Sequence, residues 1–96
     1  MATYVVLLNY TQKSVEDIKH APDRLAAAKE RARKRGSEIK SFHLTLGAYD
    51  AVVVIEAPDD QAMAAGLLET ASLGYVRTTT LRAFDENEYR KIIAAI

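Results

Sequence analysis

The chain has 96 residues, of which 49% are hydrophobic and 27% are charged. This length supports one hydrophobic core, so we expect a single domain over residues 1–96, and the apolar fraction excludes an intrinsically disordered chain. Thirteen basic residues balance thirteen acidic ones and cysteine is absent, which disfavours nucleic acid and membranes as partners and removes thiolate chemistry. We expect a cytoplasmic protein, because the N-terminus lacks a basic signal-peptide start and no apolar run approaches the ~20 residues of a membrane span.

Four segments have the composition of β-strands. They are Tyr4–Asn9, Glu38–Leu46, Ala51–Glu56 and Tyr75–Arg82. The first and third of these segments are continuously apolar, as strands that are covered on both faces should be. The second and fourth carry polar side chains, so we expect them at the edges of the sheet.

Helical patterns fill the spaces between the strands. Pro22 interrupts the first helical region because it lacks a backbone N–H, which predicts a helix over Ser14–Lys19 and another over Pro22–Arg35. A further helix begins at Asp59-Asp60, which are good N-cap residues, and ends before Gly74. A last helix begins at Asp85. The apolar side chains on one of its faces are Tyr89, Ile92, Ile93 and Ile96.

The order β-α-β-β-α-β with a terminal helix predicts an α+β, ferredoxin-like fold. Its four-stranded antiparallel sheet should have the order 4-1-3-2. Helices cover one face of such a sheet, whereas the central strands are apolar on both faces. A second copy is the simplest cover for the second face, so we predict a homodimer or higher oligomer of the dimeric α/β barrel type.

The segment Leu46-Gly47-Ala48-Tyr49-Asp50 lies between two strand-like segments that are too close for any connection except a hairpin. Gly47 supplies the backbone freedom that this reversal needs. The Gly-x-Tyr-Asp sequence resembles the signature of the GYD domain family, small bacterial and archaeal proteins. Other motifs match in order, among them Asn9-Tyr10-Thr11, Phe42-His43-Leu44 and Leu73-Gly74-Tyr75. The resemblance implies the same fold and an oligomeric assembly, and it implies no catalytic residues.

His43, Tyr49 and Asp50 are the candidate catalytic residues. The imidazole, phenol and carboxylate could surround a substrate and move a proton. In the alternative interpretation, Asp50 binds the amides of the turn, Tyr49 packs across the hairpin and His43 is hydrogen-bonded at a subunit interface.

Asn9, Tyr10, Thr11 and Arg77 are the candidate ligand-binding residues. The first three leave the first strand together, where clefts between a sheet and its helices form, although Thr11 could instead cap the following helix. Arg77 could bind an anion, and Arg82, five residues later, should face the other side of the strand. The alternative for both arginines is a salt bridge to Glu56, Asp50 or a partner subunit.

One basic cluster consists of Lys29, Arg31, Arg33, Lys34 and Arg35. It is interpreted as a solvated helix face, because no aromatic side chain is interleaved. His20 has no acidic or histidine partner at metal-binding spacing, so we expect no metal and no cofactor.

These observations favour a small homo-oligomeric binding or regulatory module that holds a small polar or aromatic ligand. One alternative is a cofactor-independent enzyme of the monooxygenase or isomerase type, with His43, Tyr49 and Asp50 around the substrate. Another is a structural assembly unit without a pocket.

Overall fold

The computed structural model describes residues 1–96, and its four strands form one antiparallel sheet. The strands are β1 (Ala2–Tyr10), β2 (Glu38–Leu44), β3 (Ala51–Ala57) and β4 (Val76–Ala83). Their order across the sheet is β2-β3-β1-β4, which is the predicted order read from the opposite edge. The ferredoxin-like α+β prediction is confirmed, with the apolar strands β1 and β3 at the centre.

The predicted hairpin connects β2 to β3. β2 ends two residues earlier than predicted, because Thr45 closes the hairpin: its amide donates to the Asp50 carbonyl (2.8 Å) and its hydroxyl donates to the Tyr49 carbonyl (2.6 Å). Gly47 has a φ of +120°. Side chains rarely tolerate this conformation, so the turn requires glycine at this position.

Three helical elements follow β1: α1 (Gln12–Glu16), the 3-10 turn η1 (Ile18–His20) and α2 (Ala21–Lys34). α1 begins before the predicted Ser14, because Thr11 is its N-cap and accepts a hydrogen bond from the Ser14 amide (3.3 Å). Pro22 lies in the first turn of α2, where its missing N–H leaves no hydrogen bond unmade. The predicted break before Pro22 is confirmed.

The other two helices begin at the predicted caps. α3 (Asp60–Ser72) follows Asp59, whose carboxylate accepts from the Ala62 amide at 2.8 Å. α4 (Glu86–Ala94) follows Asp85, which forms a complete capping box with Glu88. None of the helices in the chain has the length and the apolar character needed to cross a membrane.

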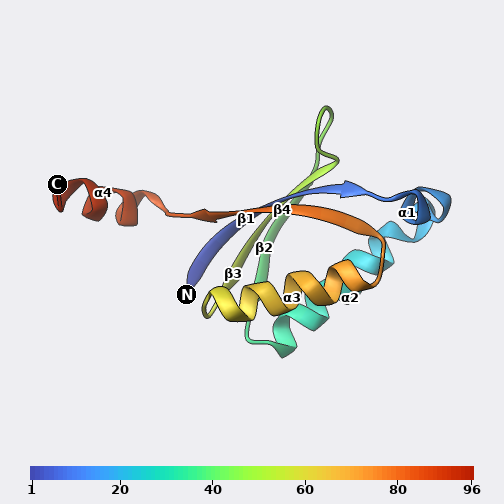
Figure 1. Cartoon of the computed structure of the whole chain (residues 1–96), viewed down its shortest axis with the longest axis horizontal. Helices are drawn as coiled ribbons and strands as arrows, with labels where there is room; N and C mark the ends of the chain where they lie inside the picture. Colours follow the sequence, from blue (N-terminus) through green and yellow to red (C-terminus); the bar gives the residue numbers. More distant parts are fainter.

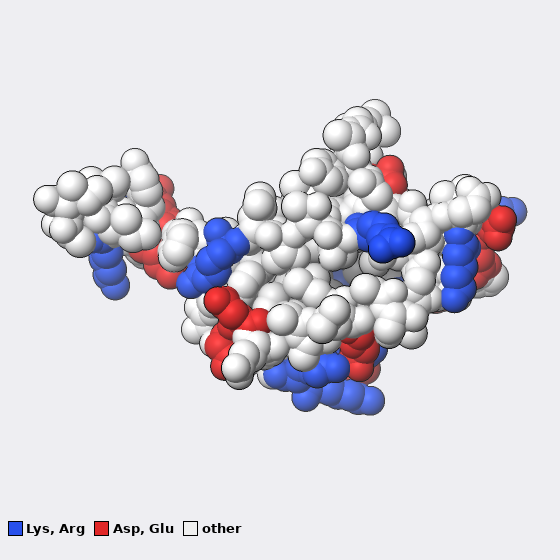
Figure 2. Space-filling model, in the orientation of Figure 1, with Lys and Arg blue, Asp and Glu red and all other residues white.

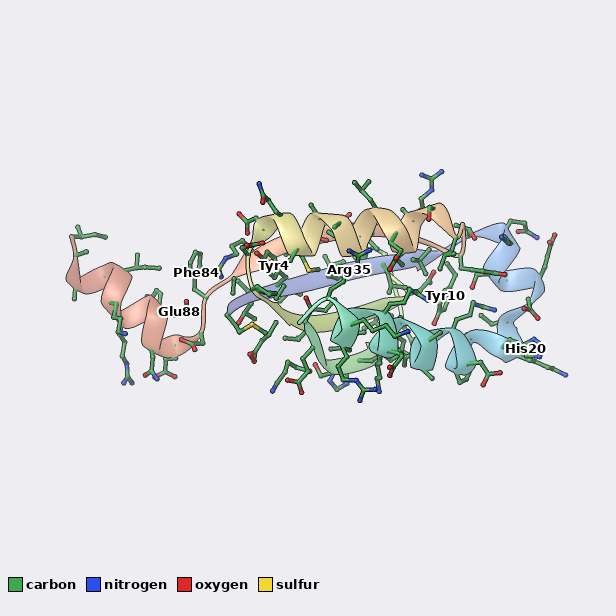
Figure 3. All side chains as sticks on the ribbon, turned by 90° about the horizontal axis from the view of Figure 1, so that it is seen from below. Tyr4, Tyr10, His20, Arg35, Phe84 and Glu88 are labelled. Carbon is green, nitrogen blue, oxygen red and sulfur yellow. The ribbon has the colours of Figure 1, made fainter.

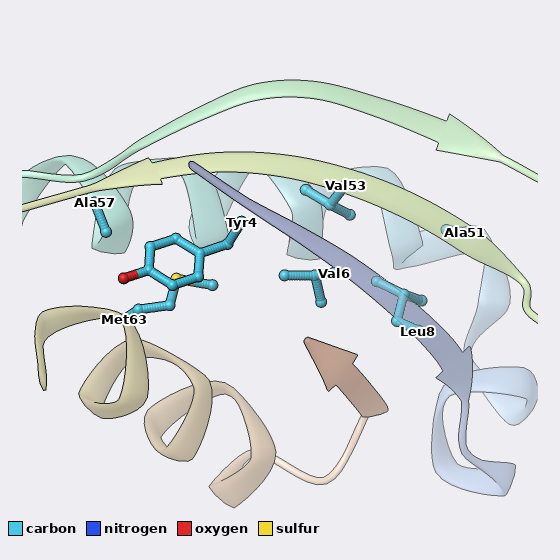
Figure 4. Packing of buried hydrophobic residues seen from close by; sticks show 7 residues of the cluster. All are labelled: Tyr4, Val6, Leu8, Ala51, Val53, Ala57 and Met63. Atoms are coloured by element: carbon cyan, nitrogen blue, oxygen red, sulfur yellow. The ribbon is translucent and has the colours of Figure 1, made fainter. Parts of the chain in front are cut away.

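α2 and α3 lie together on one side of the sheet (Figure 1). The core forms between them and the central strands and consists of Tyr4, Val6, Leu8, Ala51, Val53, Ala57 and Met63 (Figure 4). The Tyr4 hydroxyl also donates to the Asp60 carboxylate, which joins β1 to the first turn of α3. This hydrogen bond, followed by burial, raises the pKa of the Tyr4 phenol above its ordinary value.

No helix covers the other side of the sheet (Figure 1). We call it the open face, and its apolar side chains are Val5, Leu7, Val52, Val54 and Leu81. The strand register places Val5 between Val54 and Leu81, with Leu7 beside Val52. Four of these five side chains are half-buried and Leu81 is 50% exposed.

α4 continues beyond the end of β4 and projects away from the rest of the molecule (Figure 1). Its apolar side chains are uncovered, with Tyr89 58% and Ile93 52% exposed. The molecule therefore has two uncovered apolar surfaces, the open face and one side of α4.

Candidate functional site

A cavity of about 420 Å³ lies between the helices and the sheet. Its walls are mostly apolar and come from α2, α3 and all four strands. The helices contribute short residues to it, including Ala28 and Ala32 on α2 and Ala62 and Gly66 on α3. A methyl group added at Gly66 would meet only the Arg35 side chain, at 3.9 Å. The helices thus leave space above the sheet that larger side chains would fill.

The shape of β2 contributes to the cavity wall. The register of β2 against β3 shifts between Ile39 and Ser41. Ile39 and Phe42 therefore both line the cavity, although a regular strand would turn residues three apart to opposite faces. Phe42 supplies aromatic surface at this wall.

Charged side chains connect the two helices beside the cavity. Arg31 on α2 and Arg35 at its C-cap both reach the Glu69 carboxylate on α3, at 3.6 and 2.9 Å. All three side chains line the cavity and are 29 to 39% exposed. Figure 3 shows Arg35 between α2 and α3. Two guanidinium groups share one carboxylate here, so the cavity has an excess of positive charge at this wall.

Tyr10, Arg24 and Tyr75 also line the cavity. The Arg24 guanidinium lies 4.4 Å from the centre of the Tyr75 ring. It also donates to the Ser14 hydroxyl (2.8 Å) and pairs with the Asp17 carboxylate (3.2 Å). The protein's own groups therefore occupy Arg24, and its role is to hold α1 against α2 and the start of β4.

The four predicted ligand-binding residues do not form one group. Tyr10 lines the cavity, whereas Thr11 caps α1 and donates to the Gly74 carbonyl (2.6 Å). Asn9 pairs in register with Arg77 of β4. Neither Asn9 nor Arg77 lines the cavity, because neighbouring residues on a strand alternate between its faces.

The predicted intrachain salt bridges of the β4 arginines are absent. Glu56 pairs with Lys40 at 3.7 Å, and Arg77 contacts no carboxylate within the chain. Arg82 lies on the other side of β4, as expected, where its guanidinium donates to the Thr3 carbonyl (3.3 Å) and lies 4.5 Å from the centre of the Phe84 ring.

None of His43, Tyr49 and Asp50 lines the cavity between the helices and the sheet. The Asp50 carboxylate accepts from the Tyr10 amide at 2.8 Å, and the Asp50 amide donates to the Leu8 carbonyl at 2.8 Å. The interpretation of Asp50 as a partner of turn amides is therefore replaced by a bond that ties the hairpin to β1. His43 is exposed and pairs in register with Val52, which places it on the open face. No hydrogen bond joins any two of the three side chains.

His20 belongs to a small charged cluster at the start of α2. Its Nδ1 lies 2.5 Å from the Asp17 carboxylate. The hydrogen bond and the charge of Asp17 raise the pKa of His20 above its ordinary value of 6.5. The same hydrogen bond lowers the pKa of Asp17 below its ordinary value of 3.8, even though partial burial opposes this. His20 thus has an acidic partner that the sequence spacing did not indicate.

Sequence reasoning missed the polar wall of the cavity. Arg31 and Arg35 belong to the basic cluster that was interpreted as a solvated face; both side chains are about one-third exposed, and they also line the cavity. Arg24, Arg31 and Arg35 are spaced by seven and four residues, so they follow the same helical stripe as Ala28 and Ala32. Arginine on an otherwise apolar stripe was the available signal.

A model of the GYD domain matches residues 4–93 of this chain. A protein of Thermus thermophilus, described as a glutamine synthetase and cystathionine beta-lyase binding protein, is 36% identical over 84 residues, covering 86% of this chain and 88% of the relative.

Two solved structures have a similar fold. The crystal structure of FFRP-DM1 aligns with a TM-score of 0.63 and 19% identity, over 88% of this chain and 100% of that one. The crystal structure of TTHA0845 from Thermus thermophilus aligns with a TM-score of 0.57 and 24% identity, over 88% and 95%. These two likenesses concern the fold alone, whereas the domain model matches nearly the full length, and the chain belongs to the GYD domain family.

Proposed function

We propose that this chain is a cytoplasmic, homo-oligomeric module that binds another protein and regulates it. The open face of the sheet is the observation that carries the homo-oligomeric part of this proposal. Its centre is a continuous apolar surface formed by neighbouring residues of β1, β3 and β4. A surface of this kind on a small soluble protein indicates an interaction site.

A second copy suits the open face better than an unrelated partner. The central residues are valine and leucine, which pack well when two sheets stack about 10 Å apart. A twofold axis through the face would bring the same apolar patch of each copy together. Charged side chains lie toward one edge, where Lys40 reaches Glu38 and Glu56 at 3.7 Å each. An apolar centre with a charged rim is the usual anatomy of a protein interface.

α4 supports the same proposal. It is a nine-residue helix, and isolated helices of this length are marginally stable in water. Its apolar side has no covering element within the chain (Figure 1). Packing against a neighbouring subunit would bury this side and stabilise the helix.

The similarity to a binding protein supports the choice of partner. The relative from Thermus thermophilus is named for binding glutamine synthetase and cystathionine beta-lyase. We propose that this chain likewise binds an enzyme, through a surface that remains free after the open faces have paired. No observation favours the enzymatic alternative, since none of His43, Tyr49 and Asp50 lines the cavity and no hydrogen bond joins any two of their side chains.

The experiment is a direct binding measurement with both named enzymes from the organism of this chain. The chain is immobilised and each purified enzyme is passed over it, with an unrelated oligomeric enzyme as the control. Saturable binding of either named enzyme, together with a change in its activity, supports the proposal. If neither enzyme binds more tightly than the control, the proposed regulation of these enzymes is wrong.

A further inference from the structure

We propose that the cavity between α2, α3 and the sheet binds a long-chain carboxylate. The carboxylate head would lie between Arg31 and Arg35, and the apolar chain would lie along the sheet. This inference does not depend on self-association, because the cavity opens on the helical side of the sheet and the open face is on the other.

We infer from the lining residues that the cavity is a channel. Residues from Ala21 in the first turn of α2 to Arg35 just after its last turn line it, which at the rise of an α-helix corresponds to about 21 Å. A volume of about 420 Å³ over this length gives a mean cross-section on the order of 20 Å². A narrow, elongated cavity with apolar walls suits a single flexible hydrocarbon chain better than a compact ring system.

The walls exclude a polar ligand along most of this length. Leu25 on α2, Phe42 on β2 and Leu67 on α3 line the channel, together with the apolar side chains of the central strands. Protein interiors rarely leave dry apolar space of this size unfilled. Tyr10 and Thr78 are among the few polar residues that line the cavity, and a few polar groups in an apolar pocket are what orients a ligand.

The charge at the wall identifies the head group. Arg31 and Arg35 share the single carboxylate of Glu69, and the contact of Arg31 at 3.6 Å is longer than a good hydrogen bond. One positive charge is left without a partner, and a guanidinium group binds carboxylate oxygens with two parallel hydrogen bonds. Arg24 cannot serve in this way, because Ser14 and Asp17 already occupy it.

The position of Arg31 and Arg35 also fits an amphipathic ligand. Both arginines line the cavity and remain about one-third exposed. Figure 3, which looks onto the helices, shows Arg35 and Tyr10 between α2 and α3 at separate points along the groove. The head could therefore stay partly hydrated while the chain is buried, which is the arrangement that costs least for a charged group.

The test is calorimetric titration of the delipidated full-length chain with dodecanoate, and with dodecanol as a probe of equal length and uncharged head. We expect dodecanoate to bind with one site per chain and dodecanol to bind about tenfold more weakly. Methyl NMR shifts at Leu25 and Leu67 should report the same site. Failure of dodecanoate to bind, or binding without these shifts, would overturn the inference. Dodecanoate would also fail to bind if a helix of a second copy filled the groove, and the inference would then be wrong as well.

Three variants make the result specific. Arg31→Gln combined with Arg35→Gln should weaken dodecanoate about tenfold and leave dodecanol unaffected. Arg33→Gln is the matched control, because Arg33 lies on the same helix and pairs with Glu30 away from the cavity. Gly66→Leu should block the channel while strengthening the helix, since a methyl group at this position would meet only the Arg35 side chain, at 3.9 Å. Equal binding by the double variant and by wild type contradicts the head-group site, and undiminished binding by Gly66→Leu contradicts the channel.

Discussion

At the scale of single residues, Asp50 explains much of the Gly-x-Tyr-Asp signature without catalysis. Its backbone closes the hairpin through Thr45 and also donates to Leu8, while its carboxylate accepts from the Tyr10 amide. The side chain thereby satisfies a backbone donor just where β1 passes beyond the end of β3. A buried or half-buried amide without such an acceptor is costly.

Replacement of Asp50 should therefore affect folding. We expect Asp50→Ala to lower the free energy of unfolding by about 1–3 kcal/mol, because the Tyr10 amide loses its charged acceptor. Asp50→Asn keeps an acceptor oxygen and should cost less. Urea unfolding followed by circular dichroism measures both. An Asp50→Ala variant as stable as wild type would mean that the carboxylate's hydrogen bond to Tyr10 contributes nothing.

The His20–Asp17 pair should make stability depend on pH. Because folding raises the pKa of His20 above 6.5, its stabilising contribution is complete below pH 6.5 and is lost as the pH rises through the raised value. Folding lowers the pKa of Asp17 below 3.8, so the contribution of Asp17 is present above pH 3.8 and is lost as the pH falls through the lowered value.

We thus expect the urea midpoint to fall as the pH is raised from about 6 through the folded-state pKa of His20. In His20→Asn this part of the fall should disappear. The histidine NMR titration, assigned with the same variant, should have its midpoint above 6.5. A His20 midpoint at or below this value would contradict the proposed pair.

At the scale of elements, local signals predicted the fold well. Pro22 marked the start of α2, Asp59 and Asp85 marked the starts of α3 and α4, and the apolar runs identified the central strands. These signals depend on backbone chemistry within a few residues. The error at the end of β2 arose from hydrogen bonds within the turn, where Thr45 binds Tyr49 and Asp50 and ends the strand early.

The candidate site was harder to predict, because it depends on how far the helices stand from the sheet. The sequence contains the short residues on α2 and α3, but their effect appears only when both helices lie on the same side. Likewise, the pairing of Arg31 and Arg35 with Glu69 joins residues more than thirty positions apart. Strand alternation places His43 on the face opposite Phe42, and therefore outside the cavity.

At the scale of the whole molecule, the chain is thin and has little interior. Its principal extents are 49 × 31 × 17 Å, and only 9 of its 96 residues are buried. A domain of this size has a small hydrophobic core even when it is compact. Lys, Arg, Asp and Glu are scattered around a wide uncharged area on the side shown in Figure 2. These properties fit a subunit that gains stability from association, as the proposal of a homo-oligomer requires.

The open face allows the sharpest test of the proposed homo-oligomer. Val54 lies at its centre, beside Val5 on β1 and opposite Ser41 on β2. Val54→Asp would bury a carboxylate without a partner between two sheets, which is far more costly than leaving it in water. Light scattering should therefore give the 10.6 kDa mass of one chain for the variant and at least twice that mass for wild type.

Leu68→Asp is the matched control, because Leu68 is 73% exposed on α3, on the helical side of the sheet. It should keep the mass of wild type. The oligomer of Val54→Thr, a variant that preserves the shape of the side chain, should dissociate into monomers at a higher protein concentration than the wild-type oligomer. Far-UV circular dichroism verifies that each variant is folded. A wild-type chain that remains monomeric at micromolar concentration would contradict the pairing of open faces, because their apolar surface would then be stable in water without a partner.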